Sequence, residues 1–587
     1  MNLLINPVFH PLIQTLITLI LCSGILNLGR SINKFFFKYY DYYFFDLSIA
    51  VIFLSQIIFI FFVFGFFREI IIFLSYLIIF FGLINISLFK KIIQLFKLFI
   101  KKKLNIIQSL ILFFLFCFFI ISLGPPSMAD ALDYHFGIPL YLLNHLEFPN
   151  QDIWLHGSLF GNGELFNGIG LYLNSDNFFT FLQFLSFILF IEFLFGEENN
   201  NKKSIFVLLF IISSPVILFL ISGPKPLLFP QLLTTVSLYI LIKEKNLNTE
   251  NTLLIGILLL GAIQFKLSFI LSSTLLGLYL LVSTFKNNKK VFIYLIVISI
   301  FFVSPKIIYN SNQVEHFQLI NIFTTLPNLF LENLAGFRDN NWIYPVNLFI
   351  PNSYGGFTTI IGFQLFLLIF IKRIPKKIFL ILSITFFTII LHFIFGQQTS
   401  RIYFEFLLWI SLIFYFLDKK YFNYRISTYI LIPQFCLVGI IGFYFAIVSS
   451  FSLINLDLRD KFMKKNSFEY RAIQWSNNQN LSNNIIISEL RSNAFFSNEV
   501  IPLENILNLQ QTKNYVKYLN EKKPKFIISY KENFDGHFLK DCIGDVYKIS
   551  DYFEKGSRNP FNRGKVNKIY IYYFNYYKLD YCANLNR

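Results

Sequence analysis

Charged residues are scarce in this sequence. Asp, Glu, Lys and Arg together make up only 14% of its 587 residues, whereas a soluble protein carries roughly 25%. Hydrophobic residues account for 55% of the chain and the mean hydropathy is +0.58. So few charges exclude an ordinary soluble globular protein and indicate that lipid is the main solvent of the chain.

The apolar residues are grouped in runs of about 16–24 residues, close to the ~20 that an α-helix needs to cross a membrane. Strands of a membrane barrel are about half as long and alternate in polarity, which these runs do not. We therefore predict an all-α polytopic membrane protein with about fourteen transmembrane helices. The runs place these helices at about 8–29, 44–67, 70–89, 104–123, 177–196, 204–222, 226–243, 251–264, 267–285, 291–308, 358–371, 378–395, 402–417 and 426–453.

The net charge of +17 follows the loops between these helices. Basic clusters occupy alternate loops, at 30–38, 90–103, 202–203, 243–245, 286–290, 372–377 and 419–425. The intervening loops hold only Arg68, Lys225, Lys266, Lys306, Arg338 and Arg401. Such alternation is the positive-inside pattern, so the basicity reports topology and does not indicate nucleic-acid binding. The first run has no basic residues before it, which argues against a cleavable signal peptide and predicts an outer N-terminus.

The pattern divides the chain into three parts. Residues 1–103 form N-terminal transmembrane helices, 104–453 form a second transmembrane domain, and 454–587 form a small α/β domain. Short buried strands are predicted at 484–489, 525–530 and 568–574, with a helix at 510–523. The preceding helix runs outward, which predicts an extracytoplasmic domain. If this domain lies outside, Cys542 and Cys582 can form a disulfide.

Two long loops, 124–176 and 309–357, are predicted outside the membrane. Loops of this length between otherwise short connections are usually functional. The first contains no Lys or Arg but has six acidic residues: Asp130, Asp133, Glu147, Asp152, Glu164 and Asp176. In the run 251–285, two helices that meet near Lys266 keep every basic cluster on the inner side, whereas one long helix does not.

The first loop opens with PPSMADALDYHFGIP (125–139). Pro125 and Pro126 end the preceding helix, and Ser127 with Asp130 fits a capping pattern for a new helix along the membrane surface. Asp130 and Asp133 would share one face of it. Two carboxylates this close are tolerated if a cation lies between them or if one is protonated. The alternative is a helix cap at Asp130 and a solvated Asp133.

These residues resemble a known family. An apolar helix followed by a loop with DALDYHFGIP and many further helices is similar to the C-type superfamily of membrane glycosyltransferases, in particular to bacterial members that modify lipopolysaccharide-type glycans. NGELFNGIGLYL (162–173), NNWIYPVN (340–347) and TSRIYFE (399–405) are further similar segments. The resemblance implies a bacterial inner-membrane enzyme that uses polyprenyl-phosphate-linked sugars. It assigns the essential carboxylate role to Asp130 or Asp133, which could also ligate a divalent cation such as Mg²⁺ or Mn²⁺.

The residue chemistry agrees with this interpretation. Inverting sugar transfer needs a base for the acceptor hydroxyl and positive charge for the departing phosphate. Arg401, at an outer helix start, can pair with phosphate or can be an ordinary interfacial arginine. Lys266 is a second phosphate candidate, whereas Lys225 in SGPKPLLFP (222–230) is interpreted as a turn residue.

Four other residues are weaker candidates. His135 could assist proton transfer, and Glu164 is a catalytic candidate against the alternative of a solvated carboxylate. Glu405 lies one turn inside a membrane run and is expected to pair with Arg401 four residues earlier. Tyr344, like Trp154 and Trp342, could stack on a sugar ring or belong to an interfacial aromatic belt.

We therefore expect a membrane glycosyltransferase that moves a sugar from a polyprenyl-phosphate donor to an extracytoplasmic glycan or lipid acceptor. The rival interpretations are a transporter or flippase of lipid-linked glycans and a non-catalytic envelope-assembly protein. A transporter predicts charges at mid-membrane depth and symmetric broken helices, whereas here the ionisable residues gather near the outer surface.

Overall fold

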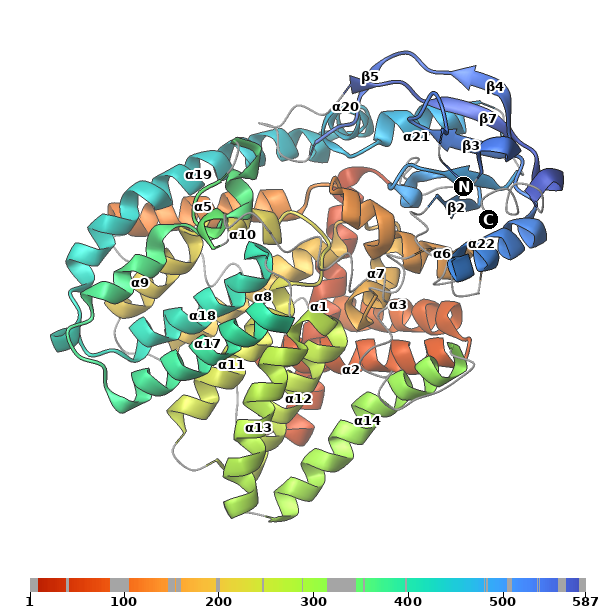
Figure 1. Ribbon diagram of the computed structural model, residues 1–587. Helices are drawn as coiled ribbons and strands as arrows, with labels where there is room; N and C mark the ends of the chain where they lie inside the picture. Colours follow the sequence, from red (N-terminus) through yellow and green to blue (C-terminus); the bar gives the residue numbers. More distant parts are fainter. Residues whose placement is uncertain are drawn as a thin grey trace.

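The computed structural model is mostly helical, at 74%, with a small C-terminal sheet region. Figure 1 shows the helices gathered in one bundle, with the C-terminal region lying across one end of it. The structure describes residues 9–37, 42–84, 105–145, 154, 160–196, 201–244, 247–287, 289–313, 345–351, 354–395, 399–479, 481, 484–503, 509–535, 537, 539–557 and 566–579.

Eight helical segments in the described part of the chain are long and apolar enough to cross a membrane. They are α1 (Pro11–Phe36), α2 (Tyr43–Val63), α3 (Phe67–Ile84), α8 (Phe178–Gly196), α13 (Ile270–Asn287) with the short turn before it, α14 (Lys289–Gln313), α17 (Lys376–Phe395) and α19 (Tyr424–Ile454). Each corresponds to one of the predicted runs. The prediction of a polytopic helical membrane protein thus holds at this coarser level.

The full set of fourteen spans is not confirmed. Four runs form shorter α-helices: α5 (Ile106–Ser122), α11 (Leu228–Lys243), α12 (Thr249–Phe265) and α18 (Ser400–Phe416). A helix of 17 residues is about 25 Å long, which is short of the ~30 Å hydrocarbon layer. The other two runs differ more. Residues 204–222 are divided into α9 (Asn201–Ile212) and α10 (Val216–Leu220), and 358–371 forms 3₁₀ turns, η5 (Tyr354–Thr359) and η6 (Phe363–Phe370).

Two residues account for these interruptions. Pro215 stands between α9 and α10, and proline has no backbone N–H to continue the helical hydrogen bonds. Gly362 has φ = +99°, a left-handed conformation that favours glycine and ends a right-handed helix. By contrast, the predicted break near Lys266 is confirmed, since α12 ends at Phe265 and α13 begins at Ile270.

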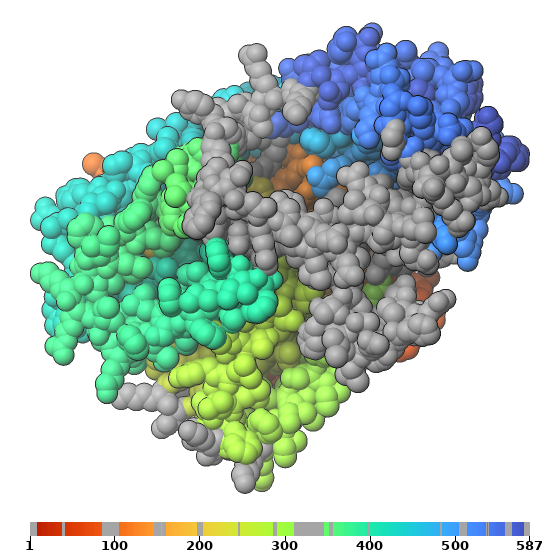
Figure 2. Space-filling view, viewed as in Figure 1, coloured from red at the N-terminus to blue at the C-terminus, as the bar shows by residue number. Residues whose placement is uncertain are grey.

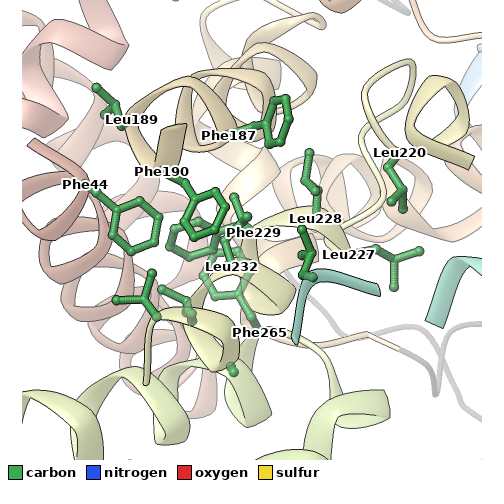
Figure 3. Packing of buried hydrophobic residues seen from close by; sticks show 14 of the residues in the cluster. Phe44, Phe187, Leu189, Phe190, Leu220, Leu227, Leu228, Phe229, Leu232 and Phe265 are labelled. Carbon is green, nitrogen blue, oxygen red and sulfur yellow. The ribbon is translucent and has the colours of Figure 1, made fainter. Parts of the chain in front are cut away.

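The core of the bundle consists of aromatic and branched side chains from inner helices (Figure 3). Phe229 of α11 lies 4.9 Å from Phe265 at the end of α12, and Phe44 of α2 lies 6.1 Å from Phe190 of α8, between ring centroids. Nearly every residue of α11 and α18 is buried. These two helices are apolar all round because protein, not lipid, surrounds them.

The outer helices differ from the inner ones. Large apolar side chains are exposed on α3, α13, α14, α17 and α19, for example Phe80, Ile300, Phe386 and Ile440. Contiguous exposed apolar surface of this kind marks contact with a membrane or a partner. These helices are the candidates for the lipid-facing surface of the bundle.

The C-terminal region begins with α20 (Leu456–Asn466) and α21 (Tyr470–Asn477). A five-stranded sheet follows, in the order β2-β1-β3-β7-β4, with α22 (Leu509–Lys522) between β2 and β3. The strands are β1 (Ile486–Ser488), β2 (Val500–Pro502), β3 (Phe526–Ser529), β4 (Ile543–Ile549) and β7 (Tyr570–Phe574), and β5 (Phe553–Glu554) pairs with β6 (Val566–Asn567). β1 is parallel to β2 and β3, whereas β7 is antiparallel to β3 and β4. The three predicted strands are β1, β3 and β7, and the predicted helix is α22.

This region packs on the segment that follows Pro126. Residues Ala131–His135 form a π-helical turn, η1, which leads into α6 (Gly137–His145). Leu132 and Phe136 are buried in one cluster with Tyr470, Phe495 and other residues of the C-terminal region. The predicted surface helix therefore exists, and its apolar side faces the C-terminal domain.

Candidate functional site

Asp130 lies at the start of η1, where three cationic side chains meet it. Lys225 makes an ion pair with Oδ2, Arg401 lies 3.6 Å from the same oxygen, and Arg491 lies 3.0 Å from Oδ1. These four residues come from the loop after α5, the turn after α10, the start of α18 and the loop after β1. We call Lys225, Arg401 and Arg491 the cationic cluster. The side chain of Asp130 is 24% exposed, Arg401 26% and Arg491 42%, so solvent reaches the cluster.

Asp133 lies on the same side of the turn as Asp130. Arg491 donates to both carboxylates, with a distance of 3.3 Å to Oδ2 of Asp133. Trp154 Nε1 donates to Oδ1 of Asp133 over 2.9 Å. The sequence required a cation or a shared proton between these two acids, and a guanidinium from the C-terminal domain is the cation. Asp130 makes no side-chain hydrogen bond to the first backbone amides of the turn, so the alternative of a helix cap at Asp130 is wrong.

A second group of ionisable residues is fully buried. Glu164 is the third residue of α7 (Asn162–Tyr172), and its Oε2 accepts from the backbone N–H of Gly161 over 2.7 Å. Its Oε1 accepts from Lys266 Nζ at 2.5 Å and lies 2.9 Å from His135 Nδ1. Glu164 is 0% exposed and His135 1%. The solvated alternative for Glu164 is thus wrong.

Protonation states follow from these contacts. Burial alone would raise the pKa of Asp130, but Lys225, Arg401 and Arg491 hold this pKa well below its ordinary value. Burial would also raise the pKa of Glu164, but the charge of Lys266 and the hydrogen bond from His135 outweigh this effect and lower the pKa. Burial lowers the pKa of His135 to about 4, so the imidazole is neutral at pH 7.

The neutral state fixes the tautomer of His135. Because the ionised carboxylate of Glu164 can only accept hydrogen bonds, Nδ1 of His135 carries the proton and donates a hydrogen bond to that carboxylate. Nε2 then holds a free lone pair, and this buried atom has no hydrogen-bond partner among the described residues. Asn167 also holds the backbone carbonyl of His135, over 3.1 Å. This arrangement orients an imidazole to accept a proton.

The donor set does not fit a divalent metal ion. A cation such as Mg²⁺ needs several oxygen ligands and tolerates few positive neighbours. Three cationic side chains surround Asp130, and across the part of the chain that is described no three His, Cys, Asp or Glu side chains are grouped to hold a metal. The surroundings of Asp130 suit an anion, and no step is assigned to a metal at Asp130 and Asp133.

The sequence analysis identified the acidic residues of the site more completely than the lysines and arginines. Asp130, Asp133 and Arg401 lie together, and His135, Glu164 and Lys266 lie together in the buried group. Lys266 therefore pairs with Glu164 and not with the cationic cluster, while Lys225, interpreted as a turn residue, belongs to that cluster. The two groups are adjacent through η1, which carries Asp133 and His135 on one turn.

Two further predictions concern the second transmembrane domain. Glu405 does not pair with Arg401; its Oε1 accepts from Thr234 over 2.5 Å, and Arg401 turns toward Asp130 instead. Tyr344 and Trp342 lie outside the described residues. Trp154 donates its N–H to Asp133, so its position is explained without a sugar.

Arg491 was not among the site residues predicted from the sequence. It lies in a Lys- and Arg-rich domain more than 350 positions from Asp130 in the chain, and only the docking of the domain brings the two together. The single local signal is its position just after a buried strand, β1, at a carboxyl edge of parallel strands where ligand-binding residues commonly lie.

A small cavity lies near the cluster. Its lining includes Ser127, three residues before Asp130, and Ser222, three residues before Lys225. Apolar side chains of α5, α19 and α20 complete it, and its volume of about 20 Å³ is enough for about one water molecule. Figure 2 shows orange atoms at the bottom of a hollow between the C-terminal domain and the green helices.

Comparison with known proteins gives a family and no described relative. No curated protein matches the chain significantly. A family model, the DUF1420 N-terminal domain, matches residues 80–463. This match covers α5 to α19 together with Asp130, Lys225 and Arg401, and it ends within α20, before the sheet and Arg491. Because the match extends over more than half of the sequence, the chain belongs to the DUF1420 N-terminal domain family.

Proposed function

We propose that the protein is a membrane glycosyltransferase. It transfers a sugar from a polyprenyl-phosphate donor to an extracytoplasmic glycan or lipid acceptor. The observation that carries this proposal is the cationic cluster around Asp130, which is open to solvent and lies at the end of an apolar helix bundle. Positive side chains in such a place favour a phosphate group whose lipid tail remains in the membrane.

In the proposed reaction, the acceptor hydroxyl oxygen bonds to the anomeric carbon of the sugar. The bond between that carbon and the phosphate oxygen breaks, and the electron pair leaves with the polyprenyl phosphate. Lys225 and Arg401 stabilise the developing negative charge on the phosphate. The hydroxyl proton passes to a base of the protein.

Three residues are candidates for the base. Asp130 and Asp133 carry their carboxyl groups next to the proposed phosphate position, but both oxygens of Asp130 are engaged by a cation, which makes it a weak base until those cations bind a ligand instead. His135 has a free Nε2 lone pair and an orienting carboxylate. We assign the base to the carboxylate pair, with His135 as the second candidate.

The exposed apolar face of α19 supports a lipid-linked donor. This helix is a candidate membrane span, and large apolar side chains such as Ile440 and Phe443 are exposed on it. A polyprenyl chain could lie along this face while its phosphate reaches Lys225.

The charge pattern and a disulfide support the proposed topology. The alternation of basic clusters favours an extracytoplasmic position for the first loop and the C-terminal domain, in the bacterial inner membrane that the resemblance implies. Cys542 is disulfide-bonded, as expected in an oxidising compartment; its predicted partner, Cys582, lies outside the described residues.

The proposal can be tested with purified protein in lipid nanodiscs and radiolabelled polyprenyl-phosphate sugars. Asp130→Asn, Asp133→Asn and Arg401→Ala should each lower the transfer rate by a factor of about 10² or more. Asp457→Asn and Arg425→Ala, which change exposed residues of the same types, should leave the rate unchanged. Full activity of both Asp variants would refute the mechanism.

One observation favours a second candidate, a flippase or transporter of lipid-linked glycans. Lys266, Glu164 and His135 form an ion-paired group enclosed by helices, and enclosed ionisable groups are typical of transport pathways. A fluorescent lipid-linked glycan that crosses liposome membranes containing the protein, without sugar transfer, would favour this candidate.

A further inference from the structure

We propose that Asp130 is an internal stand-in for a phosphate group and that Arg491 of the C-terminal domain is a ligand of that phosphate. The cluster of Lys225, Arg401 and Arg491 would then be a phosphate site assembled from two domains. This inference rests on the proposed function only for the identity of the donor, because the site itself is defined by its contacts.

The backbone of Arg491 is held in place by a buried acid. Glu469 is 2% exposed, and its Oε2 accepts from the backbone N–H groups of Arg491 at 2.7 Å and Ser492 at 3.1 Å. Tyr530, which follows β3, donates its hydroxyl to the other oxygen over 2.8 Å. The loop after β1 is therefore fixed, and the guanidinium projects toward Asp130 from a rigid base.

The domain that carries Arg491 is also fixed to the bundle. Ser467 Oγ donates to the carbonyl of Pro126 over 2.8 Å, and the N–H of Phe468 donates to the carbonyl of Ser127 over 3.2 Å. Leu132 and Phe136 add buried apolar contacts. These bonds involve the residues just before Asp130, so the position of the domain and the position of Asp130 are set together.

A phosphate can compete with Asp130 because both groups present anionic oxygens that can pair with the same cationic side chains. Arg491 uses one donor group on Asp130 and Asp133, and a guanidinium can pair with two oxygens of a phosphate. The partial exposure of Asp130, Arg401 and Arg491 leaves a path for the ligand. When phosphate neutralises the cluster, Asp130 is released and becomes a stronger base, so that donor binding itself prepares the carboxylate.

The test is binding, measured on the full chain in nanodiscs with two probes: inorganic phosphate and a polyprenyl phosphate incorporated in the bilayer. Asp130→Asn removes the internal competitor and should increase affinity about tenfold for at least one probe, because a lost charge-assisted contact is worth roughly a factor of ten. Arg491→Ala should weaken binding about tenfold, and Arg491→Lys should restore part of it. Arg471→Ala, an exposed arginine on α21, is the matched control.

The outcomes separate the two proposals. Tighter binding by Asp130→Asn together with no sugar transfer by the wild type would support the phosphate site and refute the transferase. Sugar transfer by the wild type, with unchanged or weaker phosphate binding by Asp130→Asn, would overturn the inference alone. It would also be overturned if Arg491→Ala bound both probes as Arg471→Ala does. If inorganic phosphate binds but the lipid does not, the phosphate site is supported and its ligand is a soluble phosphate compound.

Discussion

The ion pair between Asp176 and Arg459 offers the sharpest test of how the C-terminal domain is held. Asp176 precedes α8, Arg459 belongs to α20, and their side chains are 5% and 4% exposed. Breaking a buried pair by removing one partner leaves an uncompensated charge and typically costs about 3–5 kcal/mol. We therefore expect Asp176→Asn or Arg459→Met to weaken the attachment of α20 by that amount, with little solvent screening to reduce it.

Hydrogen exchange of the α20 backbone amides measures this directly. Since about 1.4 kcal/mol corresponds to a factor of ten, each single variant should raise the exchange rates by about two to four orders of magnitude. The double variant should be closer to the wild type than either single variant, because no unpaired charge remains. Lys464→Ala serves as the control: its pair with Asp460 lies on the same helix but is 44% and 34% exposed, and such pairs contribute only about 0.3–0.5 kcal/mol. Single variants that exchange within tenfold of the wild type would refute the reasoning.

Two further predictions concern pH and packing. In the folded protein the pKa of His135 is about 4, against 6.5 for an ordinary histidine. As the pH falls, the unfolded chain binds the extra proton first, so the free energy of unfolding should fall by roughly 3 kcal/mol between pH 6.5 and 4. His135→Asn should flatten this part of a plot of unfolding midpoint against pH, and an unchanged slope would contradict the assignment. A Cβ at Gly24 of α1 would lie 2.0 Å from the carbonyl oxygen of Ile78 in α3, so Gly24→Ala should lower the thermal midpoint through about 1–3 kcal/mol of overpacking. In contrast, Gly277→Ala in α13 meets no atom within 4 Å and should be neutral or stabilising, and equal effects of the two substitutions would be inconsistent with a tight contact between α1 and α3.

The sequence pattern was sufficient to predict features that depend on residues close together in the chain. Apolar runs predicted the eight candidate spans, because hydrophobic length alone decides whether a helix can cross a bilayer. The spans predicted at two inner helices are not confirmed. α11 and α18 are as apolar as a span but are shorter, at 16 and 17 residues. Residues 358–371 were equally apolar but lie in two 3₁₀ helices, with Gly362 at φ = +99° between them.

In the candidate site, too, some features follow from the sequence and others only from the tertiary structure. The sequence by itself determined that Asp130 and Asp133 share one side of a turn at a helix end, because that follows from a spacing of three residues. Which cations reach them was decided only by the tertiary structure: Lys225 and Arg491 come from segments distant in sequence, and Lys266, an equally plausible lysine, meets Glu164 instead. Spacing along a chain fixes the direction of side chains within one element, whereas the partner of a charge depends on how whole elements pack, and that packing is set by apolar contacts that the charged residues do not make.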